Sequence, residues 1–173
     1  MSTFTSIPLR QRKVDWPILG FFWLNILVIT YMIDLEQLVI ADPYDFDYPL
    51  WPPRFIIDAV HWWGSNFDPV LMERPMWWKM TIWIDQLFFG PFYIFAIWAY
   101  TKGKNWIRIP SIIYASVMMT NVTIILGEEI WGTHPTPALG IVLFANASWF
   151  LMPVYILWRM WKHEKPFTVP RLS

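Results

Sequence analysis

The chain has 173 residues, enough for one domain, which we expect to extend over residues 1–173. Hydrophobic residues make up 56% and charged residues only 15%, a composition too apolar for an ordinary soluble domain. The formal net charge is zero, so nothing in the composition favours nucleic acid as a partner. The absence of cysteine excludes disulfides and thiolate metal sites.

Four long apolar segments account for this composition. A hydrocarbon core about 30 Å thick is crossed by roughly 20 helical residues. The segments of about that length are Trp16–Ile33, Trp77–Tyr100, Trp106–Leu126 and Ala138–Met160. The N-terminal residues have neither an apolar stretch nor a small-residue cleavage site, so we expect the first span to be a retained anchor. The sequence therefore predicts an all-α membrane protein, a bundle of four transmembrane helices.

The longest connection, roughly Val39–Met76, is rich in proline, acidic and aromatic residues. Within it, Arg54–Trp63 has the pattern of a short amphipathic helix that lies in the membrane interface. The second span contains Gly90 followed by Pro91, a pair that predicts a kink in the helix.

Basic residues set the expected orientation, because the cytosolic segments of membrane proteins are enriched in lysine and arginine. Four spans place both termini on one side. Ten of the thirteen basic residues lie on that side, namely Arg10, Arg12, Lys13, Lys102, Lys104, Arg108, Arg159, Lys162, Lys165 and Arg171. The other side has only Arg54, Arg74 and Lys79. We therefore expect both termini in the cytosol and the long acidic loop in the lumen or outside the cell.

Two aspartates are the strongest candidates for chemistry. Asp85 lies about 12 Å along its helix from Trp77, at a depth where an ionisable side chain is by default functional. Asp34 lies near the same end of the first span, so the two carboxyls could meet inside the bundle. Carboxyls that meet at low dielectric share a proton, which could be donated to a substrate. The alternatives are that Asp34 caps its helix end in water and that Asp85 is a structural tie between helices.

Polar residues in the last two spans are further candidates. Asn146 and Trp149 lie one turn apart on the last helix. Asn146 would orient a ligand, and Trp149 would stabilise a cation with its ring face. Asn146 is also explained by hydrogen bonding between helices. The same ambiguity holds for Thr120, Asn121 and Thr123 in the third span.

The residues at the lumenal end of the third span allow two interpretations. Glu128 and Glu129 with His134 form either a proton relay at the lumenal rim or a solvated helix end. The histidines are too scattered for a metal site, and we expect no metal.

Several segments resemble the EXPERA superfamily, a group of four- and five-helix membrane proteins of the endoplasmic reticulum. Three segments are similar to its sigma-2 receptor branch: KGKNWIRIPSIIYASVMMT, ITYMIDLE and NFDPVL. Two are similar to its emopamil-binding branch of sterol isomerases: IDQLFFGPF and FANASWFLMP. The resemblance implies a location in the endoplasmic reticulum membrane and a pocket for a lipophilic isoprenoid or sterol ligand.

The resemblance also implies roles for individual residues. It makes Asp34 and Asp85 the two acidic pocket residues of both branches. It makes Asn146 and Trp149 pocket residues, as in the isomerases, and Asp68 the loop aspartate of the sigma-2 branch.

Two further residues complete the substrate-binding candidates. Thr30 stands where the isomerases have a histidine, four residues before the first-helix acid, and this departure disfavours sterol isomerisation. We take Thr30 as a substrate-binding candidate together with Asp68, Asn146, Trp149 and Thr120.

The sequence and the resemblance leave two main classes of function. The first is an enzyme, needing no cofactor, that protonates an alkene or epoxide of an isoprenoid lipid and then removes a proton. Its catalytic residues would be Asp34 and Asp85, and cyclisation, as in the meroterpenoid cyclases among fungal relatives, is favoured over isomerisation. The second is a non-catalytic protein that binds and transports sterols and cationic amphiphiles. A structural membrane adaptor is a third interpretation, and a homodimer is compatible with any of them.

Overall fold

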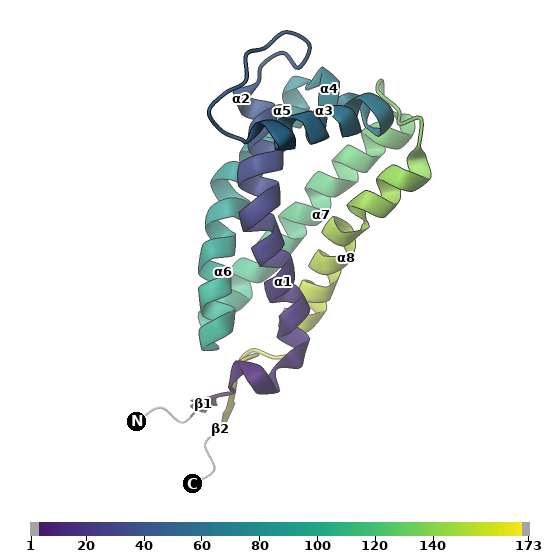
Figure 1. Ribbon diagram of the computed structural model, residues 1–173. Helices are drawn as coiled ribbons and strands as arrows, with labels where there is room; N and C mark the ends of the chain where they lie inside the picture. Colours follow the sequence, from purple (N-terminus) through teal and green to yellow (C-terminus); the bar gives the residue numbers. More distant parts are fainter. Residues whose placement is uncertain (1–3, 171–173) are drawn as a thin grey trace.

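The computed structural model describes residues 4–170, and Arg171, one of the basic residues counted above, lies outside them. Its four long helices stand side by side and are covered at one end by a cap, residues 40–75, while both chain ends lie at the opposite end (Figure 1). We call these the cap end and the terminal end. All four helices are long and apolar enough to cross a membrane, with bounds Lys13–Val39, Met76–Lys102, Asn105–Trp131 and Leu139–Trp161. The predicted class, a four-helix transmembrane bundle, is confirmed.

Two of the four long helices change their winding midway. The first consists of α1 (Trp16–Leu24), a π-helical segment (Asn25–Asp34) and α2 (Leu35–Val39). The second consists of α5 (Met76–Ile84), a π-helical segment (Asp85–Phe89) and α6 (Gly90–Lys102). The predicted kink site, Gly90 and Pro91, therefore directly follows a π-helical segment. Pro91 has no N–H to donate, which removes one bond of the regular ladder at this point.

The remaining elements are continuous helices and short pieces. The third and fourth long helices are α7 (Arg108–Trp131) and α8 (Leu139–Trp161), and α7 and α8 pack along each other. The cap contains α3 (Arg54–Phe67) and α4 (Pro69–Glu73). Short 3₁₀ turns cover Leu9–Gln11, Lys13–Asp15 and Asn105–Ile107. Strands β1 (Phe4–Ser6) and β2 (Thr168–Pro170) pair antiparallel and join the two ends of the chain.

The terminal end of the bundle is filled by aromatic side chains. Phe22 is fully buried and packs edge-on against Phe92, Tyr100 and Tyr114. The Phe92 and Tyr114 rings stack with centroids 4.4 Å apart. Below them, Asp15 is buried between the guanidinium groups of Arg12 and Arg159, which closes this end. The terminal half is therefore a solid core, and the space for a ligand lies toward the cap.

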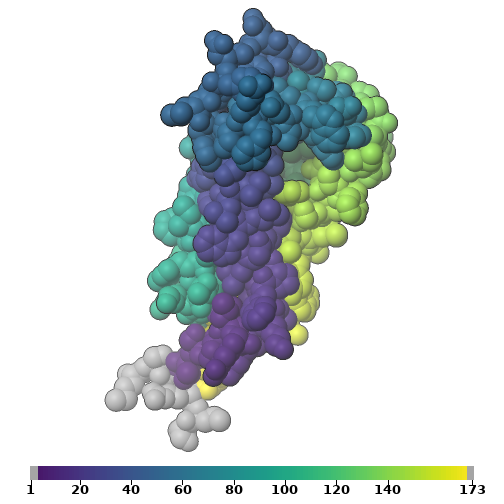
Figure 2. All heavy atoms as spheres, in the orientation of Figure 1, coloured from purple at the N-terminus to yellow at the C-terminus, as the bar shows by residue number. Residues whose placement is uncertain are grey.

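The cap lies across the other end of the bundle (Figures 1 and 2). Its helix α3 includes the predicted Arg54–Trp63 and continues to Phe67. It buries Ile57, Val60 and Gly64, which recur at intervals of three and four residues on one face. The helix ends at Asp68, whose Oδ1 accepts a hydrogen bond from the backbone N–H of Leu71 (3.3 Å) and so caps α4.

A buried ionic cluster fastens the cap to the first helix. Arg74 follows α4 in a left-handed conformation (φ 48°), which turns its side chain back toward the bundle. Its guanidinium donates to both oxygens of Glu36 at 2.9 and 3.0 Å and to the carbonyl of Ile40 at 2.6 Å. His61 of α3 contacts the same carboxylate at 2.8 Å. We call Glu36, His61 and Arg74 the cap clamp.

Candidate functional site

A cavity of about 530 Å³ lies between the cap and the four helices. This volume is within the range of about 300–1,000 Å³ typical of small-molecule sites. Every long helix and the cap contribute to its wall, which is mostly aliphatic and aromatic. The polar or aromatic residues on it include Asp34, Gln37, Trp62, Trp63, Asp68, Trp78, Thr81, Asp85, Phe89, Asn121, Asn146 and Trp149.

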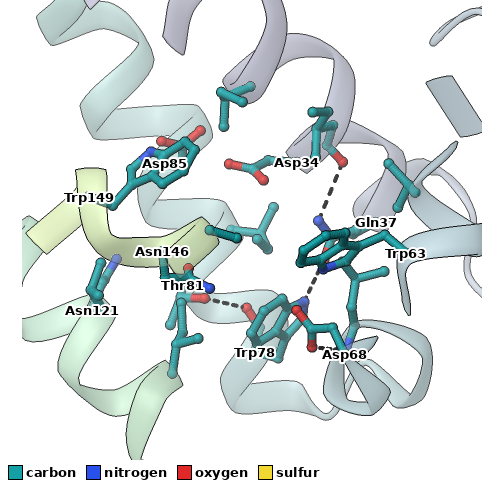
Figure 3. Close-up of a pocket in the computed structure, with 18 of the residues that line it drawn as sticks. Asp34, Gln37, Trp63, Asp68, Trp78, Thr81, Asp85, Asn121, Asn146 and Trp149 are labelled. Carbon is teal, nitrogen blue, oxygen red and sulfur yellow. Dashed lines mark hydrogen bonds between the residues drawn. The ribbon is translucent and has the colours of Figure 1, made fainter. Parts of the chain in front are cut away.

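Asp34 and Asp85 face each other on one side of this cavity (Figure 3). Each is an end residue of a π-helical segment: Asp34 is the last residue of the first and Asp85 the first residue of the second. The two carboxyls are close enough to interact electrostatically. Within residues 4–170, no lysine, arginine or histidine forms an ion pair with either of them. Two carboxyls this close on the wall of an apolar cavity favour the state in which one of them carries a proton.

Side chains that the sequence analysis did not identify hold the two π-helical segments together. Gln86 donates its amide N–H to the backbone carbonyl of Thr30, which joins one segment to the other. The Trp78 indole donates to Gln37, whose own amide donates to the carbonyl of Ile33 (3.3 Å). These bonds fix the backbone on both sides of Asp34. π-Helical turns inside α-helices occur frequently at functional sites, which is consistent with their position here.

Trp149 lies at the deeper end of the cavity, where its position is fixed by Asn25. The indole N–H donates to Asn25 Oδ1 at 2.9 Å, and the Asn25 amide donates to the Phe21 carbonyl at 2.8 Å. Asn25 is completely buried. The Phe21 ring packs edge-on against Trp149, with centroids 6.2 Å apart. The polar edge of the indole is therefore occupied by protein contacts, while Trp149 still lines the cavity.

Asn146 lines the same cavity one turn before Trp149. Its amide donates to the Val142 carbonyl at 3.0 Å, a bond within its own helix. The amide oxygen of Asn146 is therefore not used by this bond and can accept one from a ligand. Asn121 of α7, which is buried, also lines the wall.

Asp68 lies across the cavity from Asp34 and Asp85, in the part of the wall made by the cap (Figure 3). Burial is the main effect on this carboxyl and raises the pKa of Asp68 above its usual value. The nearby Glu129 carboxyl, the hydrogen bond from the Leu71 backbone N–H and the nearby Trp63 indole oppose that rise in pKa. Asp68 therefore holds its proton to a higher pH than a carboxyl in water.

The raised pKa of Asp68 predicts how stability depends on pH. The folded protein binds this proton more tightly than the unfolded chain, whose aspartates titrate near about 3.9. The stabilisation is therefore complete below that pH and is lost as the pH rises through the folded-state pKa. We expect Asp68→Asn to reduce this loss, since asparagine needs no proton and still caps α4. Melting temperatures in detergent across a pH series test this, and an unchanged pH dependence in the variant would contradict it. Asp68→Ala, which also removes the cap, should be less stable than Asp68→Asn by about 0.5–2 kcal/mol.

Two predicted substrate-binding residues lie outside the cavity wall. Thr30 is completely buried behind it, with its hydroxyl beside Asp85. Thr120 lies on the outer face of α7, where its hydroxyl donates to the Ser116 carbonyl at 3.0 Å. Adjacent helical residues point about 100° apart, so Asn121 faces the cavity and Thr120 faces away from it. The position of Thr120 does not support its prediction.

The structure separates the two glutamates at the end of α7. Glu128 accepts bonds from the Thr133 hydroxyl (2.9 Å) and the His134 backbone N–H (2.8 Å), and it pairs with the His134 ring at 2.9 Å. It therefore closes the turn after the helix. Glu129 is buried and points instead to Asp68. No local pattern in the sequence predicts this difference between neighbouring residues of the same type.

The arrangement can perform acid–base chemistry on an apolar molecule. The Asp34 and Asp85 carboxyls lie on one side of a largely apolar cavity, which Trp149 and Asn146 also line, and Asp68 lies across from them. Charged groups act strongly in such a low-dielectric site because little water screens them.

Comparisons with known proteins agree with this architecture. A family model described as EXPERA (EXPanded EBP superfamily) matches residues 55–160. The sigma intracellular receptor 2 of Macaca fascicularis is 32% identical over 123 residues, 70% of this chain and 65% of that protein. The human protein of that name is 32% identical over 121 residues, 69% of this chain and 64% of that protein. The one from Xenopus tropicalis is 29% identical over 126 residues, 72% of this chain and 68% of that protein. The matched part is thus slightly less than two thirds of the macaque and human proteins.

Proposed function

This chain belongs to the EXPERA family, and we propose that it is a membrane-embedded enzyme that performs acid–base chemistry on an isoprenoid lipid. The observation that carries the proposal is the facing pair of carboxyls, Asp34 and Asp85, on the wall of an apolar cavity. No cofactor is needed for this chemistry, because the proton itself is the electrophile.

The proposed reaction starts with proton transfer from Asp85. The proton adds to an alkene carbon, where the π electron pair forms the new C–H bond, or to an epoxide oxygen, which keeps the electron pair of the C–O bond that breaks. Either event leaves a carbocation on the substrate. The two carboxylates of Asp34 and Asp85 then face that positive charge and stabilise it. Trp149 offers its ring face to the cation, and Asn146 orients the polar part of the substrate. Loss of a proton from a neighbouring carbon forms a new double bond and completes a cyclisation or isomerisation. We favour cyclisation, because Thr30 has no imidazole to act as an additional acid.

A second candidate is a non-catalytic binder of sterols or cationic amphiphiles. The observation that favours it is the similarity to proteins named receptors. The same Asp34 and Asp85 pair would then hold a cationic amine, with one carboxyl ionised.

Turnover in microsomes separates the two candidates. Membranes that contain the protein are supplied with a farnesylated phenol, its terminal epoxide and a sterol with one ring double bond, and the products are identified by mass spectrometry. The enzyme proposal predicts conversion of at least one of them. Binding of sterol that depends on Asp34, with no conversion of any probe, would favour the binder instead.

The proposed orientation has both termini in the cytosol and the cap in the lumen of the endoplasmic reticulum. It rests on the excess of basic residues at the terminal end. Protease added to intact microsomes should therefore remove a C-terminal tag, while a tag inserted in the loop 40–53 should be protected. Protection of the C-terminal tag would reverse the orientation.

Trp149→Ala is expected to slow turnover and to release products that terminate earlier. The cation loses a π face, worth about 0.5–2 kcal/mol, and the cavity gains space in which a partly cyclised intermediate is captured. Trp149→Phe keeps a ring but loses the bond to Asn25, and it should lie between the wild type and Trp149→Ala. Product profiles by mass spectrometry test this order, and identical profiles for all three proteins would remove Trp149 from the mechanism.

A further inference from the structure

Glu129 is a buried acid that the proposed reaction does not yet use. Its side chain is 1% exposed, and neither carboxyl oxygen accepts a conventional hydrogen bond from a donor within residues 4–170. Its partner is the Asp68 carboxyl. The backbone keeps the two residues together, because Thr136 donates its N–H to the Glu129 carbonyl (3.0 Å) and its hydroxyl to the carbonyl of Phe67, the neighbour of Asp68.

Within residues 4–170, no lysine, arginine or histidine forms an ion pair with Asp68 or Glu129. Glu129 faces Asp68 and the like charge of Glu128, which is held by His134 and Thr133. Asp68 faces the Trp63 indole from α3 and the Leu71 N–H from α4. The cap clamp holds Arg74 on Glu36, away from the pair. Two neighbouring buried carboxyls without an ion pair among the described residues favour the state in which they share a proton.

The cavity thus has a carboxyl pair on each of two sides. Asp34 and Asp85 lie on one side, and Asp68 lies across from them (Figure 3). Glu129 is the neighbour of Asp68. We propose that Asp68 is the base that removes the final proton from the carbocation, and that Glu129 is the positioning residue that shares this proton. This inference rests on the proposed function and assigns its last step.

The step balances without any further reactant. The C–H bond next to the cationic carbon breaks, its proton binds an Asp68 oxygen, and its electron pair forms the C=C bond of the product. Before the step the Asp68 and Glu129 pair holds one proton and one negative charge; after it the pair holds two protons and no charge. Burial favours the uncharged state, so the pair is a strong proton acceptor in this environment. Between turnovers the proton leaves through water at the cap, and Asp85 is protonated again.

Asp68→Asn tests the base separately from the donor. In this variant Asp85 still protonates the substrate, so consumption continues, but the cation is no longer deprotonated at its usual carbon. We expect water to capture the cation, so that the ratio of alkene to alcohol product falls by about 10²-fold, the lower range for the loss of a general base. Asp85→Asn should instead slow consumption of the substrate itself, by roughly 10²–10⁴-fold. The probes are the farnesylated phenol, its terminal epoxide and the sterol used above, and the melting temperature confirms that Asp68→Asn is folded.

Two variants of Glu129 test its positioning role. Glu129→Gln keeps a donor to Asp68, whereas Glu129→Leu removes it and thereby raises the pKa of Asp68 further. We therefore measure the alkene-to-alcohol ratio across a pH series. The pH at which this ratio changes should be higher in Glu129→Leu than in the wild type, and it should stay near the wild-type value in Glu129→Gln. A merely structural role would lower turnover at every pH without this shift.

The outcomes distinguish this inference from the proposed function. The inference would be overturned if Asp68→Asn gave the wild-type products and the wild-type alkene-to-alcohol ratio. It would also be overturned if both Glu129 variants gave the same pH profile. In either case, turnover by the wild type would still support the proposed enzyme function. A wild type that converts none of the probes would overturn the proposed function and this last step with it.

Discussion

Asp85→Asn is expected to lower turnover by roughly 10²–10⁴-fold, the range typical of losing a general acid. Asparagine has nearly the size of aspartate and keeps much of its hydrogen bonding, but it has no acidic proton. The cavity should therefore still take up the lipid, because its aliphatic and aromatic wall is unchanged. Turnover and binding of one radiolabelled lipid, measured on the same membranes, separate the two effects.

A matched control is available on the outer face of α7. Thr123 is exposed there, and its hydroxyl donates only to the Met119 carbonyl of its own helix (2.7 Å). Thr123→Val should keep wild-type turnover. If Asp85→Asn kept turnover as well but weakened the binding of a cationic amphiphile, the pair would hold a charge rather than donate a proton, and the binder would be the better interpretation.

The parts of this fold that the sequence predicts are those with a local signal. Hydropathy located all four spans, although the first three helices extend beyond their apolar segments at both ends, as in Lys13–Val39 against the predicted Trp16–Ile33. The helices are longer than the apolar segments because polar residues beyond a segment still form the backbone hydrogen bonds of the helix. Asp34 and Asp85 can be predicted from the sequence because an acid within or beside an apolar segment is recognisable without knowing which face of the helix it occupies.

The missed residues depend on partners far away in the chain. Asn25 bonds Trp149 over a separation of 124 residues, and Gln37 bonds Trp78 over 41, so neither pair leaves a local pattern. A regular α-helix has 3.6 residues per turn, and the π-helical segments that end at Asp34 and begin at Asp85 depart from that periodicity. Glu129 and Glu128 illustrate the same limit, since only the fold decides which of two adjacent acids turns inward.

Arg74→Ala is expected to destabilise the protein by about 3–5 kcal/mol, the range for removing one partner of a buried ion pair. The Arg74 and Glu36 side chains are 1% and 0% exposed, so the variant leaves the Glu36 carboxylate buried with His61 as its remaining contact. Arg54→Ala is the matched control, because Arg54 pairs with Asp58 at 3.6 Å with both side chains exposed (73% and 52%). A pair of this kind contributes at most about 1 kcal/mol. Thermal and denaturant unfolding in detergent measure both variants.

The clamp also connects stability to the site. Glu36 follows Asp34 by two residues, and Arg74 follows the α4 helix that Asp68 caps, so the clamp fixes both sides of the cavity through one ion pair. Arg74→Ala should therefore weaken lipid binding at temperatures where the protein is still folded. The double variant Glu36→Leu with Arg74→Leu removes both charges and should be more stable than Arg74→Ala alone, since no buried carboxylate is left unpaired. If Arg74→Ala proved no more destabilising than Arg54→Ala, the cap clamp would not be what holds the cap on the bundle. The hydrophobic contacts between the cap and the bundle would then be what holds it.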